Sequence, residues 1–132
     1  MAHMYVTLPK ISVDQRDALV KNLTETMVNV LGLSSEVRRR LSIRLDPYEA
    51  RDVARDGRPL DVSEHPLTHI DVFITELPFD QKRELVRHLT TALCDSLGYR
   101  SEQREDVFIT FHQFRPENIA VGGHLVAELT MV

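Results

Sequence analysis

The chain repeats itself once, and this repeat limits the folds that it can adopt. Shifting the sequence by 66 positions aligns identical residues along most of its length without a gap. The aligned pairs include Asp14-Gln15 with Asp80-Gln81, Leu19-Val20 with Leu85-Val86, Leu31-Gly32 with Leu97-Gly98, Ser35-Glu36 with Ser101-Glu102, Ile43 with Ile109, and Gly57 with Gly123. Because one constant offset accounts for all of these pairs, we interpret the chain as a duplicated unit.

The first copy has the pattern of a strand, a helix and a second strand. A short strand is predicted over residues 5–8, before Pro9. Ser12 and Gln15 have the spacing of a capping box, in which each side chain pairs with the other residue's backbone N–H. Gly32 is typical of a left-handed helix end, and residues 41–45 alternate as a half-buried strand. The predicted helix carries one apolar stripe, formed by Leu19, Val20, Leu23, Met27, Val30 and Leu31.

The second copy repeats this pattern. Residues 70–75 alternate as a strand, a helix runs from near Pro78 to Gly98, and residues 107–111 form the fourth strand. A polar connector separates the two copies, and Leu125-Val126-Ala127 is predicted to be a short extra strand. The basic run Arg38-Arg39-Arg40 is interpreted as a solvated lead-in to a strand, with an anion contact as the alternative.

These elements predict an α+β fold in a single domain, 1–132. Repeat one covers about residues 4–60, the connector about 46–66, and repeat two about 68–126. A strand–helix–strand unit is a right-handed crossover with parallel strands, so two units give a four-stranded sheet with both helices on one face. The other face stays uncovered although it carries Phe73 and Phe108, and exposed apolar sheet surface predicts self-association.

Composition narrows the possible partners. A formal net charge of -4 argues against a nucleic-acid surface, because phosphate binding requires a basic face. No apolar run reaches the roughly 20 residues of a membrane span. The single cysteine, Cys94, excludes an internal disulfide and favours a reducing compartment, so a cytoplasmic location is expected.

The stretch Glu117-Asn118-Ile119-Ala120-Val121-Gly122-Gly123 follows the last strand of the second copy. Together with the 66-residue repeat, it resembles the tautomerase superfamily, which includes 4-oxalocrotonate tautomerase, macrophage migration inhibitory factor and malonate semialdehyde decarboxylase. The resemblance covers nearly the whole chain, including the Asp-Gln-Arg and Asp-Gln-Lys openings of the two helices. It implies a homotrimer that acts on a small carboxylic acid, with no cofactor and no metal.

The chemistry of that superfamily depends on an amino-terminal proline and on arginines that hold the substrate carboxylate. This sequence has Ala2 after Met1, and its loop 75–79 contains no arginine. Phe108 and Ser42 stand near the position where 4-oxalocrotonate tautomerase carries an arginine. The opening Met1-Ala2-His3 is either native or a cloning remnant ahead of Met4. We therefore expect at most weak catalysis.

Six residues remain as site candidates. If Met1 is removed, Ala2 presents a primary amine that a desolvated pocket would keep neutral as a base. Lys10 and Arg44 are candidates for holding an anion, with a solvated role as the alternative for each. Ile119 and Val121 would form an apolar wall, and His112 could supply a polar group to the pocket. For these three residues, packing or a structural role is the alternative.

Two further classes of function stay open. One is a non-catalytic superfamily member that keeps the trimer as a scaffold. The other is a ferredoxin-like module that binds small molecules, since that fold also has the order β-α-β-β-α-β.

Overall fold

The computed structural model describes residues 2–129. Its helices are α1 (Val13–Leu31), α2 (Ser35–Arg40), α3 (Phe79–Leu97) and α4 (Val126–Leu129), with short 3-10 turns at Ala50–Asp52, Ser101–Asp106 and Pro116–Asn118. Its strands are β1 (Ala2–Pro9), β2 (Ser42–Tyr48), β3 (Ala54–Arg55), β4 (Arg58–Pro59), β5 (Thr68–Thr75), β6 (Val107–Phe114), β7 (Ala120–Val121) and β8 (His124–Leu125).

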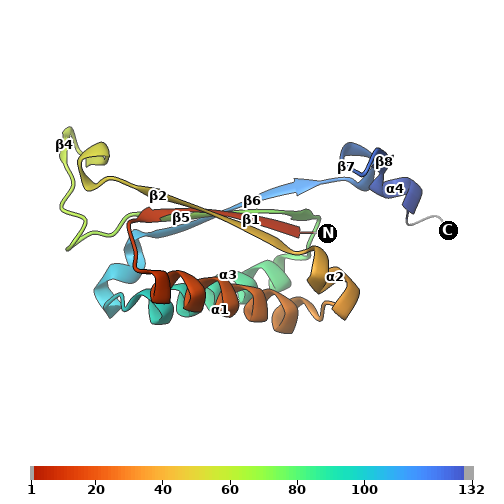
Figure 1. Ribbon diagram of the computed structural model, residues 1–132, viewed down its shortest axis with the longest axis horizontal. Helices are drawn as coiled ribbons and strands as arrows, with labels where there is room; N and C mark the ends of the chain where they lie inside the picture. The colour runs from red at the N-terminus through yellow and green to blue at the C-terminus, as the bar shows by residue number, and fades with distance from the viewer. Residues whose placement is uncertain (1, 130–132) are drawn as a thin grey trace.

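Four long strands form one mixed sheet in the order β2-β1-β5-β6. The strands of each repeat are parallel neighbours, β1 with β2 and β5 with β6, while β1 and β5 join the two repeats antiparallel. Helices α1 and α3 lie side by side beneath one face of the sheet, and the other face is uncovered (Figure 1). The predicted α+β fold is confirmed. The ferredoxin-like alternative was wrong, because that fold splits its β-α-β units and this sheet does not.

The helix ends follow the local sequence signals. The backbone N–H of Gln15 donates to Ser12 Oγ at 3.1 Å, and the N–H of Ser12 donates to Gln15 Oε1 at 3.0 Å. The capping box is therefore present. Gly32 and Gly98 end α1 and α3 in the left-handed conformation, with φ of 63° and 70°. Glycine takes this conformation without the strain that a Cβ atom would bring.

The core lies between the helix pair and the covered sheet face. Alternate residues of β1 and β5 point into it, so every second residue of both strands is buried and the residues between them are intermediate, or exposed in the case of Phe73. The fully buried side chains of the core are Met4, Val6, Leu8, Leu19, Leu23, Met27, Ile70, Val72, Leu85, Leu89 and Leu93. Because this core runs the length of the sheet, it fixes the ends of the strands relative to one another.

The structure adds a helix to one local prediction, the exposed run that leads into β2, and corrects another. The run Arg38-Arg39-Arg40 ends a short helix, α2, which Ser34 caps through a hydrogen bond from Val37 N at 3.2 Å. The extra strand predicted at Leu125-Val126-Ala127 includes only Leu125, since Val126–Leu129 is helical. Gly122 and Gly123, with φ of 61° and 86°, make the tight turn between β7 and β8, and Val126 N then donates to Ile119 O at 2.8 Å.

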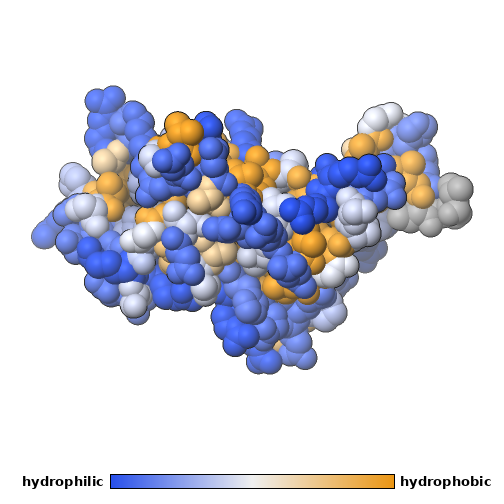
Figure 2. Space-filling model, turned by 60° about the horizontal axis from the view of Figure 1, so that its bottom comes forward, coloured by the Kyte–Doolittle hydropathy of each residue, from blue (hydrophilic) through white to orange (hydrophobic). Residues whose placement is uncertain are grey.

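Residues 115–129, here called the C-terminal arm, project beyond the end of β6 (Figure 1). Contacts of the arm are mainly among its own elements, β8, α4 and the turn at Pro116–Asn118. Val121, Leu125 and Leu129 are 36%, 39% and 44% exposed, and Figure 2 shows apolar surface on this projecting segment. No helix within residues 2–129 is both long enough and apolar enough to cross a membrane.

Candidate active site

Ala2 begins β1 and is only 3% exposed. It pairs with Ile74 of β5, and both residues line a cavity of about 180 Å³. The rest of the lining is contributed by Leu31, Leu33, Val37, Thr75, Leu77 and Gln81. Six of the eight lining residues are aliphatic, so an amine placed here would be less solvated than at the open surface, which favours its neutral form.

A second hollow lies at the same end of the sheet. Ile74 pairs with Ala2 on one side and with Gln113 of β6 on the other. Since neighbouring strands lie about 4.8 Å apart, the backbones of Ala2 and Gln113 are about 10 Å apart. Gln113 lines a polar cavity of about 380 Å³ together with Glu76, Phe114, Arg115 and Asn118. The last residue of β5, Thr75, lines the first cavity, and Glu76, which begins the following loop, lines the second.

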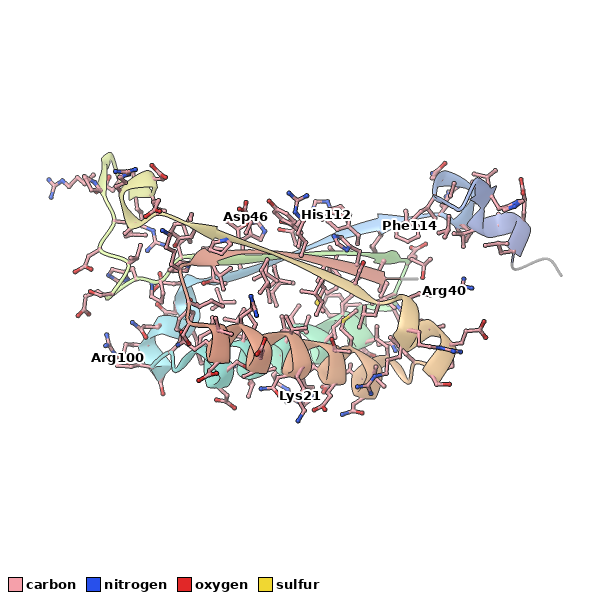
Figure 3. The ribbon with its side chains drawn as sticks, viewed as in Figure 1. Lys21, Arg40, Asp46, Arg100, His112 and Phe114 are labelled. Atoms are coloured by element: carbon pink, nitrogen blue, oxygen red, sulfur yellow. The ribbon has the colours of Figure 1, made fainter. Side chains whose placement is uncertain are left out.

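A single arginine and a run of three arginines lie at this end of the sheet. Arg115 directly follows β6, and its closest ion-pair contact, 3.7 Å to Glu117, is between exposed side chains. Helix α2 supplies Val37 to the Ala2 cavity and ends in Arg38, Arg39 and Arg40, for which the described residues provide no ion pair. Figure 3 shows Arg40 at the α2 end of the molecule. Guanidinium groups at this end can bind a carboxylate in a bidentate geometry.

Within one chain, the two predicted cations lie away from Ala2. Lys10 follows Pro9 at the far end of β1, about 26 Å from Ala2 at about 3.3 Å per residue, and it forms an ion pair with Glu49. Arg44 lies on the uncovered face, with its guanidinium carbon 5.2 Å from the centroid of the Tyr5 ring. The side chain of Ala2 points to the opposite, helix-covered side of the sheet.

The other three predicted residues are also placed apart from the Ala2 cavity. His112 stands on the uncovered face (Figure 3), where its Nε2 lies 2.7 Å from Asp71 Oδ1. Ile119 and Val121 belong to the C-terminal arm, which starts at the same end of the sheet as Ala2. Neither residue lines either cavity at that end.

Sequence reasoning missed Arg115, Gln113 and Gln81. No local pattern marks Arg115 and Gln113, because only the antiparallel pairing of β1 with β5 brings the end of the last long strand to the same end of the sheet as the start of the first. Gln81 belongs to the Asp-Gln-Lys opening of α3, which was used to align the repeats and not to search for site residues. The antiparallel arrangement of the repeats was not predicted, so these residues could not be connected to Ala2.

The opposite end of the sheet carries a third cavity, of about 320 Å³. Its lining residues are Thr7, Tyr48, Asp52, Val53, Leu67, His69 and Phe108. The repeat offset relates Val53 to Ile119 and Tyr48 to Phe114, so the connector takes the place in the first repeat that the C-terminal arm takes in the second. The Tyr48 hydroxyl donates to Leu67 O at 2.5 Å, and burial raises the pKa of Tyr48 to about 12.

Comparison with known proteins bears on this arrangement. Residues 66–129 match the family described as Tautomerase enzyme. This segment is the second copy of the repeat. The first copy aligns with it at the 66-residue offset and forms the same strand–helix–strand unit. An asymmetric trimer of a fused 4-OT has 19% sequence identity over 96% of this chain and 98% of its own, with a TM-score of 0.83. Residues 66–129 therefore belong to the tautomerase family, and the whole chain has the fold of the fused 4-OT structures.

Two further solved structures have the same fold. A symmetric trimer of a fused 4-OT is 21% identical, covers 97% of this chain and 98% of its own, and has a TM-score of 0.81. A malonate semialdehyde decarboxylase inhibited by 3-bromopropiolate is 19% identical, covers 97% of this chain and 95% of its own, and has a TM-score of 0.73. No curated protein matches the sequence.

Proposed function

We propose that this superfamily member is a cytoplasmic homotrimer that weakly catalyses keto–enol interconversion of a small 2-oxo or unsaturated carboxylic acid. The observation that carries the proposal is the position of Ala2, which begins β1 inside an aliphatic cavity of about 180 Å³. A chain whose Met1 is removed would present its amine at this cavity. A free amine has an ordinary pKa of about 7.7–8.0, and burial lowers that value, so the neutral base is available near neutral pH.

The amine would act as base and acid in turn. In ketonisation it takes the proton of the enol hydroxyl, and the ammonium formed delivers a proton to the neighbouring carbon. The C=C bond becomes a single bond, the C–O bond becomes a carbonyl, and the amine returns to its neutral form. A primary amine can carry out both transfers, but it rotates more freely than a ring amine, so it is held less well for transfer.

The substrate carboxylate requires a cation near this end of the sheet. The chain itself brings several cations to that end, among them Arg115, the arginines that end α2, and Lys82, whose Nζ donates to Gln113 Oε1 at 3.0 Å. Lys10 and Arg44 would contribute only from a neighbouring copy of the chain, because in their own chain they lie elsewhere. We assign the apolar wall to Ile119 and Val121, again through a neighbouring copy, and a polar supporting role to His112.

Assembly and location are supported by different features. Two of the fused 4-OT structures with the same fold are described as trimers. The exposed apolar residues of the C-terminal arm and the uncovered sheet face provide surface for such contacts. A cytoplasmic location agrees with the one cysteine, Cys94, which is buried and free.

A non-catalytic role is the second candidate. It is favoured by the absence of arginine from the described lining of the Ala2 cavity and by alanine standing in place of the superfamily's proline. In that case the trimer would serve as a scaffold or an interaction surface.

Ketonisation of phenylenolpyruvate tests the proposal. The protein and its Ala2→Pro variant are compared after mass spectrometry has confirmed each amino terminus. We expect low activity in the Ala2 protein and a clear increase in the Pro variant. Inactivity of both proteins would support the scaffold role, and high activity in a protein that retains Met1 would show that the base is a different group.

A further inference from the structure

The two repeats correspond in structure as closely as they do in sequence. Helix α3 has the bounds of α1 shifted by 66 residues, and β5 has the bounds of β1 shifted by the same amount. The offset also relates the 3-10 turns that follow β2 and β6, and the strand pairs β3-β4 and β7-β8. Strand pairing agrees, because Pro9 pairs with Tyr48 and Thr75 pairs with Phe114. Each residue can therefore be compared with its counterpart in the other repeat.

One pair of charges is reversed between the repeats. Lys10 and Glu49 directly follow β1 and β2, and they form an ion pair. Their counterparts are Glu76 and Arg115, which directly follow β5 and β6. Each pair combines one long cationic side chain with one shorter carboxylate on the same backbone frame. The contact that the first pair makes is therefore within reach of the second pair.

In the second repeat these two side chains border a cavity and do not contact each other. Glu76 and Arg115 both line the polar cavity of about 380 Å³. Within residues 2–129, Glu76 forms no ion pair. Arg115 has the exposed contact with Glu117, at 3.7 Å, and Glu117 is not part of the lining. The cavity thus presents a carboxylate and a guanidinium to a ligand.

A second cation lies beside this cavity. Lys82 Nζ donates to Gln113 Oε1, which belongs to a lining residue, and lies 6.0 Å from the centroid of the Phe111 ring. Neither contact supplies a negative charge. Among the described residues, the lining and this hydrogen-bond partner hold two cations and one carboxylate, so a ligand with one carboxylate balances their charges.

We propose that Glu76 determines which substrates this site accepts, by competing with the substrate carboxylate for Arg115 and by keeping a second carboxylate out of the cavity. The substrate is then a small 2-oxo or unsaturated acid with one carboxylate and an otherwise uncharged chain. The inference rests on the proposed function and adds the charge of the substrate to it.

Competition follows from the correspondence of the repeats. Without a substrate, Glu76 is able to close on Arg115 as Glu49 closes on Lys10. A substrate carboxylate takes the place of Glu76 at the guanidinium, so it binds less tightly than it would without this competitor. Glu76 is exposed, and solvent screens an exposed ion pair, so the expected change in affinity is a few-fold.

A second carboxylate on the substrate meets a further cost. Once the first carboxylate is bound to Arg115, Glu76 has lost the cation nearest to it in the cavity. A second negative charge in the same cavity is then repelled by Glu76, whereas an uncharged group is not. Glu76 should therefore weaken the binding of a diacid more than that of a monoacid.

Two acids with the same number of carbon atoms test this, namely 2-oxopentanoate with one carboxylate and 2-oxopentanedioate with two. Their dissociation constants are measured from amide chemical shifts in NMR titrations. The wild type should bind the monoacid more tightly. Glu76→Gln should tighten binding of the monoacid by about twofold and binding of the diacid by about five- to tenfold. Glu76→Lys should reverse the preference.

Glu36→Gln is the matched control. It makes the same change in net charge on an exposed residue of α2, at the same end of the sheet, and Glu36 lines neither cavity there. It should keep the wild-type ratio of the two dissociation constants. Circular dichroism confirms that each variant is folded, and Glu76→Gln alone decides the ratio if Glu76→Lys does not fold.

The outcomes separate the inference from the proposed function. The inference is overturned if Glu76→Gln leaves the ratio unchanged, if Glu36→Gln changes it equally, or if neither acid binds to any of these proteins. Ketonisation of phenylenolpyruvate by the Ala2→Pro variant in any of those cases leaves the proposed function standing. A ratio that shifts as expected, without ketonisation by that variant, overturns the proposed function and supports charge selection at a binding site.

Discussion

Ala2 and Ile74 are paired across the antiparallel junction of β1 and β5, and both line the same small cavity. Ala2 has too small a side chain to fill this space, whereas Ile74 is 4% exposed and packs into the core. The start of β1 is therefore held in place by its pairing with the end of β5. Any chemistry at Ala2 depends on this junction between the two repeats.

Ile74→Ala should lower the free energy of unfolding by about 2–5 kcal/mol, because it removes buried methyl groups beside an existing cavity. Ile43→Ala is the control, since Ile43 is half-buried on the edge strand β2. Urea unfolding of the two variants makes the comparison. If Ile74→Ala costs no more than Ile43→Ala, the junction is less tightly packed than the structure indicates.

Stability at high pH should depend on Tyr48. Burial raises the pKa of this phenol from 10.0 to about 12, so the folded state prefers the neutral form. The stabilisation is therefore complete below about pH 10, the unfolded value, and is lost as pH rises toward 12. We expect unfolding in urea to become easier between about pH 9 and pH 11, and Tyr48→Phe to reduce that change. If the wild type and the Tyr48→Phe variant lose the same stability at high pH, groups other than Tyr48 cause the loss.

Asp106 should anchor the connector to the rest of the domain. This carboxylate is 4% exposed, and its two oxygens lie 3.1 Å from Arg55 Nη1 and 3.2 Å from His65 Nδ1. Asp106→Asn should lower the free energy of unfolding by about 1–3 kcal/mol, because it weakens buried charge-assisted contacts. It should also speed proteolysis between residues 49 and 66. The exposed Asp95→Asn is the control, and equal proteolysis of both variants would contradict the assignment.

The sequence predicted those parts of the fold that depend on local signals. The capping box at Ser12 and Gln15 and the glycines at 32 and 98 specify helix ends through contacts within a few residues. The 66-residue repeat then predicted the helix and strands of the second copy from those of the first. The Asp106 contacts with Arg55 and His65 span 51 and 41 residues, and no local pattern marks such a pair.

The candidate site was harder to predict for the same reason. It forms where the start of β1 meets the ends of β5 and β6, so it depends on how the two repeats pair. Strand alternation showed that residues such as Phe73 leave the core, but not that β1 and β5 are antiparallel neighbours. Val126 was assigned to a strand because valine favours strands, whereas in the structure it begins the short helix α4, directly after the paired strands β7 and β8.

The C-terminal arm should contribute to assembly. Leu125 is 39% exposed on a segment that has few contacts with the body of its own chain. Leu125→Asp should shift sedimentation toward the monomer, because a charge would have to be buried where an apolar side chain docks. Val13→Asp is the matched control, since Val13 is 60% exposed at the first turn of α1, where an acidic residue suits the helix. Unchanged sedimentation of Leu125→Asp would exclude this residue from the interface.

Arg115 should hold the substrate carboxylate. It lines the polar cavity together with Gln113, whose backbone is about 10 Å from that of Ala2, and its contact with Glu117 is long and exposed. In the Ala2→Pro background, Arg115→Gln should lower kcat/KM for phenylenolpyruvate by about ten- to a hundredfold, the value of a charged hydrogen bond of about 1.5–3 kcal/mol. The enol of the methyl ester lacks the negative charge, so its rate should change little.

Arg58→Gln serves as the control for Arg115→Gln, because Arg58 is exposed on β4 at the opposite end of the molecule (Figure 1). A loss that is equal for the acid and the ester would indicate that Arg115 supports the local structure and does not bind the carboxylate. An unchanged rate with both substrates would transfer the role to Arg40 of the same chain, or to Lys10 or Arg44 of a neighbouring copy. The corresponding glutamine variants, measured with the same two substrates, distinguish these cations.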